Sequence, residues 1–217
     1  MLVVPGGSAS NSPLLLLPGR RCWRSPARGG DECCKVVVEE VILPRGPPAR
    51  AAAQAGPVIS GFTLDGLDGN PLALSRFSGK VLLVVNTASK CAFTPQYEGL
   101  EALWRRYAPR GLVVIGVPSN DFGRQEPGTA SDIKEFCTQT YDVTFPMAGK
   151  TVVRGANAHP LYKAFERALG RNGVPGWNFH KVLVGRDGIP SAGFASRVRP
   201  GDPRVTLAIE AELARPL

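Results

Sequence analysis

The chain has 217 residues, of which 43% are hydrophobic, and this length allows one domain with a sizeable core plus an appendage. Its formal net charge of +8 is spread without a block of like charges, so we expect a solvated basic surface and no nucleic-acid partner. The sequence holds no run of about 18 apolar residues, which predicts that no helix spans a membrane.

The cysteines indicate free thiols. They are too few for this chain length to form a disulfide framework, no C-x-x-C spacing occurs, and no histidine lies at metal-ligand spacing to any of them. We therefore expect reduced cysteines, a cytoplasmic setting and no bound metal. The cysteines are Cys22, Cys33, Cys34, Cys91 and Cys137.

Residues 1–56 differ from the rest of the chain in composition. They are rich in Pro, Gly, Arg and Ala and show no sustained hydrophobic period, so they cannot bury enough apolar surface to offset the entropy of ordering. We expect a disordered N-terminal extension, in which residues 35–43 could form an isolated strand. The first 30 residues contain four Arg and no acid, so an organellar transit peptide is the alternative to a dispensable tail.

An ordered pattern begins after this extension. Residues 61–80 favour two short strands around an Asp-Gly-Asn turn. The run VLLVVNT at 81–87 predicts a strand buried on both faces, and GLVVIGVPS at 111–119 predicts a second one. Between them, Pro95 opens an expected helix that continues to Tyr107 with apolar residues at helical spacing. These segments form a βαβ unit, whose crossover is almost always right-handed.

Helices and a hairpin are expected in the C-terminal half. Thr129 and Asp132 have the spacing of a capping box at the start of a helix that ends near Tyr141. Two more helices are expected at 159–170 and 202–214, and HKVLVGRDGIPSAGFAS between them favours a hairpin with an Asp-Gly turn. This order of elements predicts an α/β sandwich with a mixed central β-sheet flanked by helices, the thioredoxin-like fold.

Cys91 is expected in the loop that leaves the carboxyl end of the first buried strand, just before a helix. Open α/β sheets bind their ligands at this end. Free N–H groups, the positive end of the helix dipole and the neighbouring Lys90 all favour a thiolate, which is the nucleophilic form. A structural cysteine would be expected inside the strand or on the apolar stripe of the helix. We therefore expect Cys91 to react, and oxidation by a peroxide needs fewer partners than acyl transfer.

Polar side chains on two other loops are candidates for the same site. Gln125 follows the second buried strand and should lie at the same sheet end as Cys91. Trp177 and Asn178 stand just before a later strand. An indole N–H and two side-chain amides are neutral donors that could stabilise both a thiolate and a leaving oxygen.

Several segments together carry a family resemblance. NTASKCAFTPQYEGLEAL, SNDFGRQEPG, VTFPM, NAHPLY and WNFHKVLV, in this order and spacing, resemble the glutathione peroxidase family in its cysteine-containing form. The resemblance covers residues 57–217 and implies a thioredoxin-like fold, reduction of hydrogen peroxide and of organic or lipid hydroperoxides, and no prosthetic cofactor. It also implies that Cys91 is the peroxidatic residue and that Gln125, Trp177 and Asn178 complete the catalytic tetrad.

A few positions depart from the family pattern without touching the tetrad. Asp121 replaces a usual Gln, and Ser119 fills a position where many relatives have a third cysteine. His180 stands where Thr is common, and we expect it at the surface or at a pocket edge rather than as a group that tunes Cys91. His159, which precedes Pro160, looks like a structural helix-start residue.

The electron donor depends on Cys137, which resembles the resolving cysteine of thioredoxin-dependent relatives. It lies one position earlier in its helix than the plant-type residue, and it also fits the apolar stripe, where a cysteine can act as a small hydrophobe. A bond to Cys91 requires local opening of the helix. Because no cluster of Arg or Lys motifs suggests a glutathione site, we favour thioredoxin over glutathione as the reductant.

Alternative functions use the same cysteine. A thiol-disulfide oxidoreductase would need a C-x-x-C motif, whereas Thr94 stands at the second cysteine position. A peroxide sensor would oxidise at Cys91 and relay the signal to a partner, and it would differ from a peroxidase by stalling after one turnover. The short connection between Gly170 and Trp177, where oligomeric relatives carry a longer packing loop, predicts a monomer.

Overall fold

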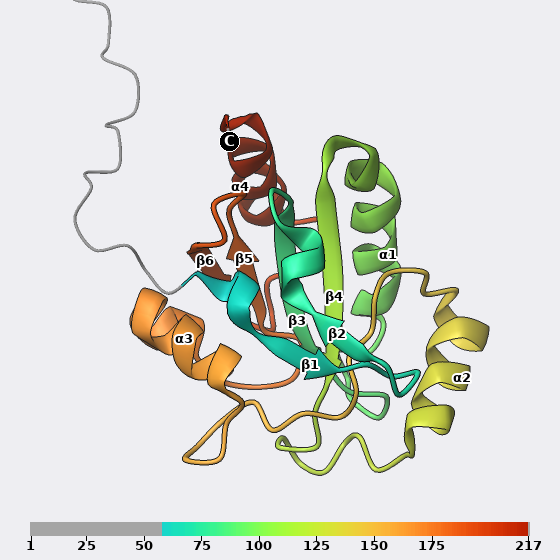
Figure 1. Cartoon of the computed structure of the whole chain (residues 1–217). Coiled ribbons are helices and arrows are strands. Elements are labelled where there is room, and N and C mark those ends of the chain that lie inside the picture. The colour runs from blue at the N-terminus through green and yellow to red at the C-terminus, as the bar shows by residue number, and fades with distance from the viewer. Residues whose placement is uncertain (1–57, 217) are drawn as a thin grey trace, which may run out of the picture. The chain divides into compact units, whose positions relative to one another are not determined.

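The computed structural model describes residues 58–216. The expected extension at residues 1–56, with its possible strand or transit peptide, lies outside this range. Besides short 3₁₀ turns, the described part contains ten strands and α-helices (Figure 1), which are β1 (Thr63–Asp65), β2 (Pro71–Ala73), β3 (Val81–Thr87), α1 (Gln96–Tyr107), β4 (Leu112–Pro118), α2 (Ala130–Tyr141), α3 (Pro160–Leu169), β5 (Lys181–Val184), β6 (Pro190–Phe194) and α4 (Pro203–Ala214).

The central sheet is mixed, as the sequence predicts. Its strand order is β4-β3-β5-β6; β3 and β4 run parallel, whereas β3–β5 and β5–β6 are antiparallel. Every residue of β3 and β4 is buried, in agreement with their continuous apolar sequences. Because Thr87 pairs with Pro118, the carboxyl ends of both strands lie at one edge of the sheet. The predicted N-terminal hairpin is also present, and β1 and β2 form a separate two-stranded sheet.

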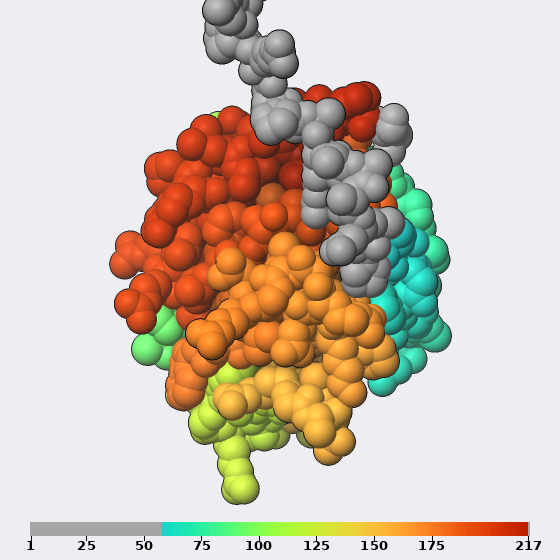
Figure 2. All heavy atoms as spheres, turned by 90° about the vertical axis from the view of Figure 1, so that its left-hand side faces the viewer, coloured from blue at the N-terminus to red at the C-terminus, as the bar shows by residue number. Residues whose placement is uncertain are grey.

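Two apolar layers cover the faces of this sheet. Side chains of Leu83 and Val85 face a core built from α1, α4 and part of α2. Leu82 and Val84, which alternate with them along β3, face a second core that includes α3 and the hairpin. The layers are visible in Figure 1, and Figure 2 shows α3 in orange beside the red C-terminal segments on one side of the molecule.

Local sequence signals set the helix ends. Both hydrogen bonds of the predicted capping box are formed at the start of α2, where Thr129 is the N-cap and Asp132 its partner. The ring of His159 accepts a hydrogen bond from Leu161 N–H, which confirms this histidine as the residue that starts α3. The fold therefore follows the expected thioredoxin-like α/β arrangement across the described residues.

Candidate active site

Cys91 lies in the loop between β3 and α1, half-buried and outside both elements. The Thr94 side chain fixes this loop, because its hydroxyl accepts a hydrogen bond from Cys91 N–H at 3.0 Å and donates one to Ala88 O at 2.9 Å. The backbone closes the same turn, since Thr94 N–H donates to Cys91 O at 3.0 Å. Thr94, which stands where a C-x-x-C motif has its second cysteine, therefore stabilises the loop through these hydrogen bonds. The sequence analysis did not predict this role.

The sulfur of Cys91 has a backbone donor. Phe93 N–H donates to Cys91 Sγ at 3.4 Å, just ahead of the first turn of α1. This bond fixes the position of the sulfur at the start of the segment that leads into the helix. The Lys90 side chain is exposed, and its backbone N–H donates to Gln125 O at 3.0 Å. This bond ties the Cys91 loop to the segment that follows β4.

Gln125 and Asn178 are joined directly. Asn178 Nδ2 donates to Gln125 Oε1 at 2.8 Å, and the Asn178 side chain is fully buried. This bond fixes the direction of the Gln125 amide, so that its own N–H groups point away from Asn178. The structure therefore places two of the predicted site residues together, beside the loop that carries Cys91.

Trp177 is held mainly by its backbone. Its side chain is 40% exposed and packs against Phe122, with ring centroids 5.7 Å apart. Asn86 Nδ2 donates to Trp177 O at 3.1 Å, and Asn86 O accepts from Phe179 N–H at 2.6 Å. Phe179 has a positive φ of 62°, a conformation that non-glycine residues rarely adopt. Asn86 thus donates one hydrogen bond and accepts another, and together these bonds fix the segment that contains Trp177 and Asn178.

Asn86 is a site-building residue that the sequence analysis missed. The signal was available, because an asparagine inside an apolar strand must find partners for its amide when it is buried. Asn86 is the sixth residue of β3 and is only 1% exposed. A polar residue near the carboxyl end of a buried strand therefore indicates the edge at which the site is built.

The surface location expected for His180 is wrong. His180 is 6% exposed, and its Nε2 lies 2.9 Å from Asn172 O. Burial lowers the pKa of its imidazole. The ring lines a hollow together with Phe93 and Trp177, so the pocket-edge alternative describes it correctly. The 3₁₀ turn Gly170–Gly173, which packs against β6, brings the Asn172 carbonyl to this ring.

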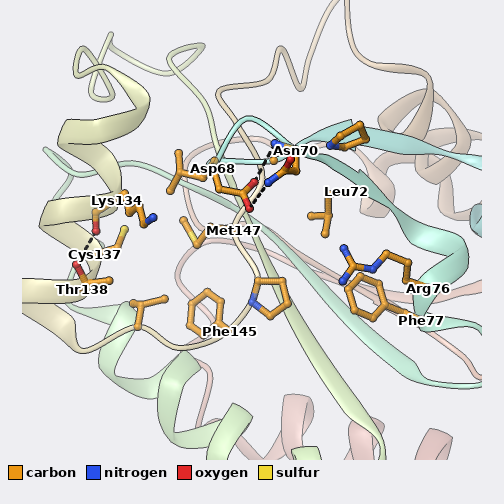
Figure 3. Close-up of a pocket in the computed structure, with 15 residues that line it drawn as sticks. Asp68, Asn70, Leu72, Arg76, Phe77, Lys134, Cys137, Thr138, Phe145 and Met147 are labelled. Carbon is orange, nitrogen blue, oxygen red and sulfur yellow. Dashed lines mark hydrogen bonds between the residues drawn. The ribbon is translucent and has the colours of Figure 1, made fainter.

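Cys137 has the opposite surroundings to Cys91. It lies on α2, is 1% exposed and forms no disulfide with Cys91. Burial is the main cause that raises the pKa of its thiol to about 11. Figure 3 shows Cys137 and Lys134 extending from α2 at one side of a hollow of about 380 Å³, with Leu72 and Arg76 at the other. The structure does not bring the two cysteines into bonding contact.

Within residues 58–216, no group of three His, Cys, Asp or Glu side chains could hold a metal ion. None of the helices in this range is long and apolar enough to cross a bilayer. The thiol of Cys91 and the polar side chains near its loop are the groups that the structure assembles at this sheet edge. Fold and site together define a thiol-based oxidoreductase with a thioredoxin-like fold.

Comparison with known proteins identifies the family. The family model for glutathione peroxidase matches residues 59–166. A hydroperoxy fatty acid reductase from Synechocystis sp. is 48% identical over 158 residues, which span 69% of this chain and 94% of the relative. The thioredoxin/glutathione peroxidase BtuE from Escherichia coli is 40% identical over 171 residues, which span 69% of this chain and 93% of BtuE. The chain belongs to the glutathione peroxidase family, and it is an enzyme of the thiol peroxidase type.

Solved structures agree with this assignment. The crystal structure of Trgpx in apo form is 36% identical, with a TM-score of 0.61, and covers 75% of this chain and 99% of its own. A thiol:disulfide interchange protein of the thioredoxin family from Chlorobium tepidum is 19% identical with a TM-score of 0.55, and this likeness shows the fold alone. The predicted fold class and family are therefore confirmed.

Proposed function

We propose that Cys91 is the nucleophile with which this peroxidase reduces hydroperoxides. The main support for this role is the position of Cys91. The residue is half-buried, and its sulfur accepts a hydrogen bond from Phe93 N–H in a loop that Thr94 holds in place. The thiolate attacks the terminal peroxide oxygen, an S–O bond forms and the O–O bond breaks. The alkoxide leaves with the bonding electrons and takes up a proton, so the products are Cys91 sulfenic acid and an alcohol, or water from hydrogen peroxide.

Gln125, Trp177 and Asn178 are proposed as donors for this step. The bond from Asn178 to Gln125 leaves the Gln125 N–H groups free to act on the sulfur or on the leaving oxygen. The partly exposed Trp177 lines a hollow with Phe93, which follows Cys91 by two residues, so its indole borders the approach to the thiol. Preorganised neutral donors of this kind need not change protonation during the reaction.

We further propose that Cys137 resolves the sulfenic acid and that thioredoxin then reduces the disulfide. Of the twelve residues of α2, Ile133 and Cys137 are buried and Phe136 and Tyr141 pack partly against the same core, whereas α1 buries five residues, so α2 should open more readily than α1. The hollow beside Cys137 provides space next to the helix. BtuE is named as using thioredoxin or glutathione, which supports both reductants and keeps glutathione as the alternative. Neither route requires a prosthetic group.

A further hollow bears on substrate preference. It runs beside the Cys91 loop, and its lining includes Phe93 and Pro95, the cationic Arg197 and Arg199, and the acidic Glu98 and Asp202. Both arginines are exposed, and no ion pair is formed by either within the described part of the chain. The apolar part of this lining suits the acyl chain of a hydroperoxide, whereas the two cations are matched in number by the two acids. The name of the Synechocystis relative supports fatty acid hydroperoxides as substrates.

The nucleophile is tested by single turnover. We expect the wild-type protein, mixed with a limiting amount of peroxide, to consume it and to oxidise Cys91, which is then found as a trapped sulfenic acid or as a disulfide with Cys137. Cys91→Ser should lose this reaction, because a serine hydroxyl is a far weaker nucleophile at neutral pH. Consumption by Cys91→Ser at more than about a tenth of the wild-type rate would overturn the assignment.

The reductant is tested by steady-state turnover with either the thioredoxin system or glutathione and its reductase. We expect faster turnover with thioredoxin, and Cys137→Ser should lose at least about 90% of it. Faster turnover with glutathione, or full thioredoxin-linked activity in Cys137→Ser, would contradict the proposal. Continued cycling with either reductant also distinguishes a peroxidase from a peroxide sensor.

The remaining expectations concern assembly and the N-terminal extension. We propose a cytoplasmic monomer in which residues 57–217 carry the activity, because the connection between Gly170 and Trp177, which begins with the 3₁₀ turn Gly170–Gly173, is too short to supply a packing loop between subunits. Light scattering that gave a tetramer mass would contradict the monomer. Deleting residues 1–56 should leave the melting temperature and the peroxidase rate unchanged, and imaging with and without this segment would reveal a transit peptide.

A further inference from the structure

Lys181, the first residue of β5, is completely buried. It pairs with Val85 of β3 and alternates with Leu183, so its side chain starts on the same face of the sheet as these two apolar residues. An apolar side chain would fill this position without the cost of removing an ammonium group from water. Lys181 forms no ion pair with any residue between 58 and 216. A buried lysine that no carboxylate neutralises calls for an explanation.

The hydrogen bond of this lysine goes to a residue with an unusual backbone conformation. Lys181 Nζ donates to Phe179 O at 2.7 Å. Phe179 is itself fully buried, and its φ of 62° lies in the left-handed region that a residue with a bulky side chain rarely adopts. Such conformations persist only where the surrounding structure holds them, and they are concentrated at functional sites. Lys181 is therefore one of the groups that hold Phe179 in this conformation.

Both peptide groups of Phe179 are held by hydrogen bonds. Its N–H belongs to the peptide group shared with Asn178 and donates to Asn86 O at 2.6 Å. Its carbonyl belongs to the next peptide group and accepts the bond from Lys181. Because peptide groups are planar, fixing the two groups on either side of Phe179 fixes both of its backbone dihedral angles. The bonds thus set the direction in which the chain runs from β5 to Asn178.

We propose that Lys181 is a positioning residue of the peroxidase site, which holds Phe179 in its left-handed conformation and thereby keeps Asn178 against Gln125. This inference rests on the proposed role of Asn178 and Gln125 as donors in the oxidation of Cys91. The 2.8 Å bond between the two side-chain amides requires the Asn178 backbone to stay in place. Without the bond from Lys181, Phe179 can relax toward a negative φ, and the neighbouring Asn178 then moves away from Gln125.

A lysine suits this task because of its length and its several donors. Its side chain is long enough to reach back from β5 to the carbonyl two residues earlier in the chain. Burial lowers the pKa of the Lys181 ammonium to about 7. The nitrogen keeps N–H groups in its charged and in its neutral form, so the bond to Phe179 O persists when the proton is lost. The proposed effect on the site is therefore one of position and not of charge.

The test compares Lys181→Met with wild type in the full chain. Methionine keeps a long unbranched side chain of similar volume but has no donor. We expect stopped-flow oxidation of Cys91 by hydrogen peroxide to slow about tenfold, because the donors of the site lose their alignment. Lys163→Met, at an exposed position of α3, is the matched control and should oxidise at the wild-type rate.

NMR of ¹⁵N-labelled protein follows the position of Asn178 without relying on the reaction. The side-chain amide signals of Asn178 are assigned by their absence from Asn178→Ala. In Lys181→Met they should shift and exchange faster with solvent, because the bond to Gln125 is weakened. Lys181→Leu also removes the donor and should reproduce both results, which guards against a folding defect specific to the methionine variant.

A double substitution separates positioning from any other effect of the lysine. In an Asn178→Ala background the amide that Lys181 positions is gone, so adding Lys181→Met should slow the oxidation of Cys91 by less than about twofold. A full tenfold loss in that background would overturn the inference, because the lysine would then act by another route. A wild-type rate with unmoved Asn178 signals in Lys181→Met would overturn the inference alone. A wild-type rate in Asn178→Ala would overturn the proposed donor role of Asn178 and this inference with it.

Discussion

Cys91 and Cys137 contact the same hydrophobic core, yet their surroundings differ in almost every respect. Cys91 lies in a loop, half-exposed, with a backbone N–H on its sulfur. Cys137 lies inside a helix, enclosed by apolar side chains, with its thiol held in the protonated form. The comparison shows that one core holds a partly exposed thiol at its edge and a buried, protonated thiol within it.

The helices next to the two cysteines also differ in how many residues they bury. α1, which follows Cys91, buries Tyr97, Leu100, Leu103, Tyr107 and even Glu101, so its position is strongly fixed. The Glu101 carboxylate is used structurally, because it accepts hydrogen bonds from Thr144 and Arg105. α2 buries far less and depends more on its capping box. The peroxide-reactive side should therefore be rigid, and the resolving side should open more readily.

Thiol labelling gives the largest expected contrast. In the reduced protein near pH 7, we expect iodoacetamide to modify Cys91 about a thousandfold faster than Cys137, because only the thiolate reacts and Cys137 is both buried and protonated. Peptide mass spectrometry over time gives both rates in one sample. Urea sufficient to unfold the chain serves as the control and should make the rates similar. Comparable rates in the folded protein would remove the distinction between the two thiols.

Asn178→Ala tests whether the Cys91 side depends on preorganised polar groups. The substitution removes the 2.8 Å bond to Gln125, and we expect Cys91 oxidation to slow about a hundredfold because the Gln125 amide loses its fixed direction. Stopped-flow oxidation by hydrogen peroxide measures this rate. Asn157→Ala, at an exposed turn, is the matched control. An unchanged rate in Asn178→Ala would show that the thiol reacts without this pair.

Lys181→Met tests how a buried lysine affects the pH dependence of stability. Lys181 lies in β5, beside the strand that leads to Cys91. Lys181 pairs with Val85, its Nζ donates to Phe179 O at 2.7 Å, and burial lowers the pKa of its ammonium to about 7. The unfolded chain binds a proton here up to about pH 10, so the free energy of unfolding should rise between roughly pH 7 and 10. We expect this rise to shrink by about 3 to 4 kcal/mol in Lys181→Met.

Chemical denaturation at several pH values measures the effect. Lys163→Met, at an exposed position of α3, should leave the pH dependence unchanged. Equal slopes for wild type and Lys181→Met would mean that Lys181 keeps its ordinary protonation in the folded state.

Thr129→Ala has the smallest expected effect and acts on the Cys137 side. Loss of the N-cap should destabilise α2 by about 1 kcal/mol, which makes its opening about fivefold more frequent. If opening limits the resolving step, disulfide formation should accelerate by a similar factor, with little change in the oxidation of Cys91. Hydrogen exchange of α2 amides measures the opening. Thr140→Ala, near the other end of α2, should not increase it, and exchange unchanged by Thr129→Ala would show that the cap does not control the helix.

Much of the architecture follows from local sequence signals. Continuous apolar runs predict β3 and β4, helical spacing predicts α1, and a capping box predicts the start of α2 within one residue. The loop position of Cys91 follows from these boundaries, because the cysteine falls between a strand and a helix. Local periodicity is reliable here because strand and helix periods are short compared with the elements themselves.

The partners of the site were decided only by the tertiary structure. The bond from Asn178 to Gln125 joins residues 53 positions apart, and the bond from Asn86 to Trp177 O spans 91 positions. Burial of His180, Glu126 and Lys181 likewise arises from segments that fold over them from elsewhere in the chain. The sequence by itself determined the elements, the loop position of Cys91 and the sheet edge at which it lies. Which polar atoms meet there, and which charges lose their water, depends on long-range packing that no local pattern encodes.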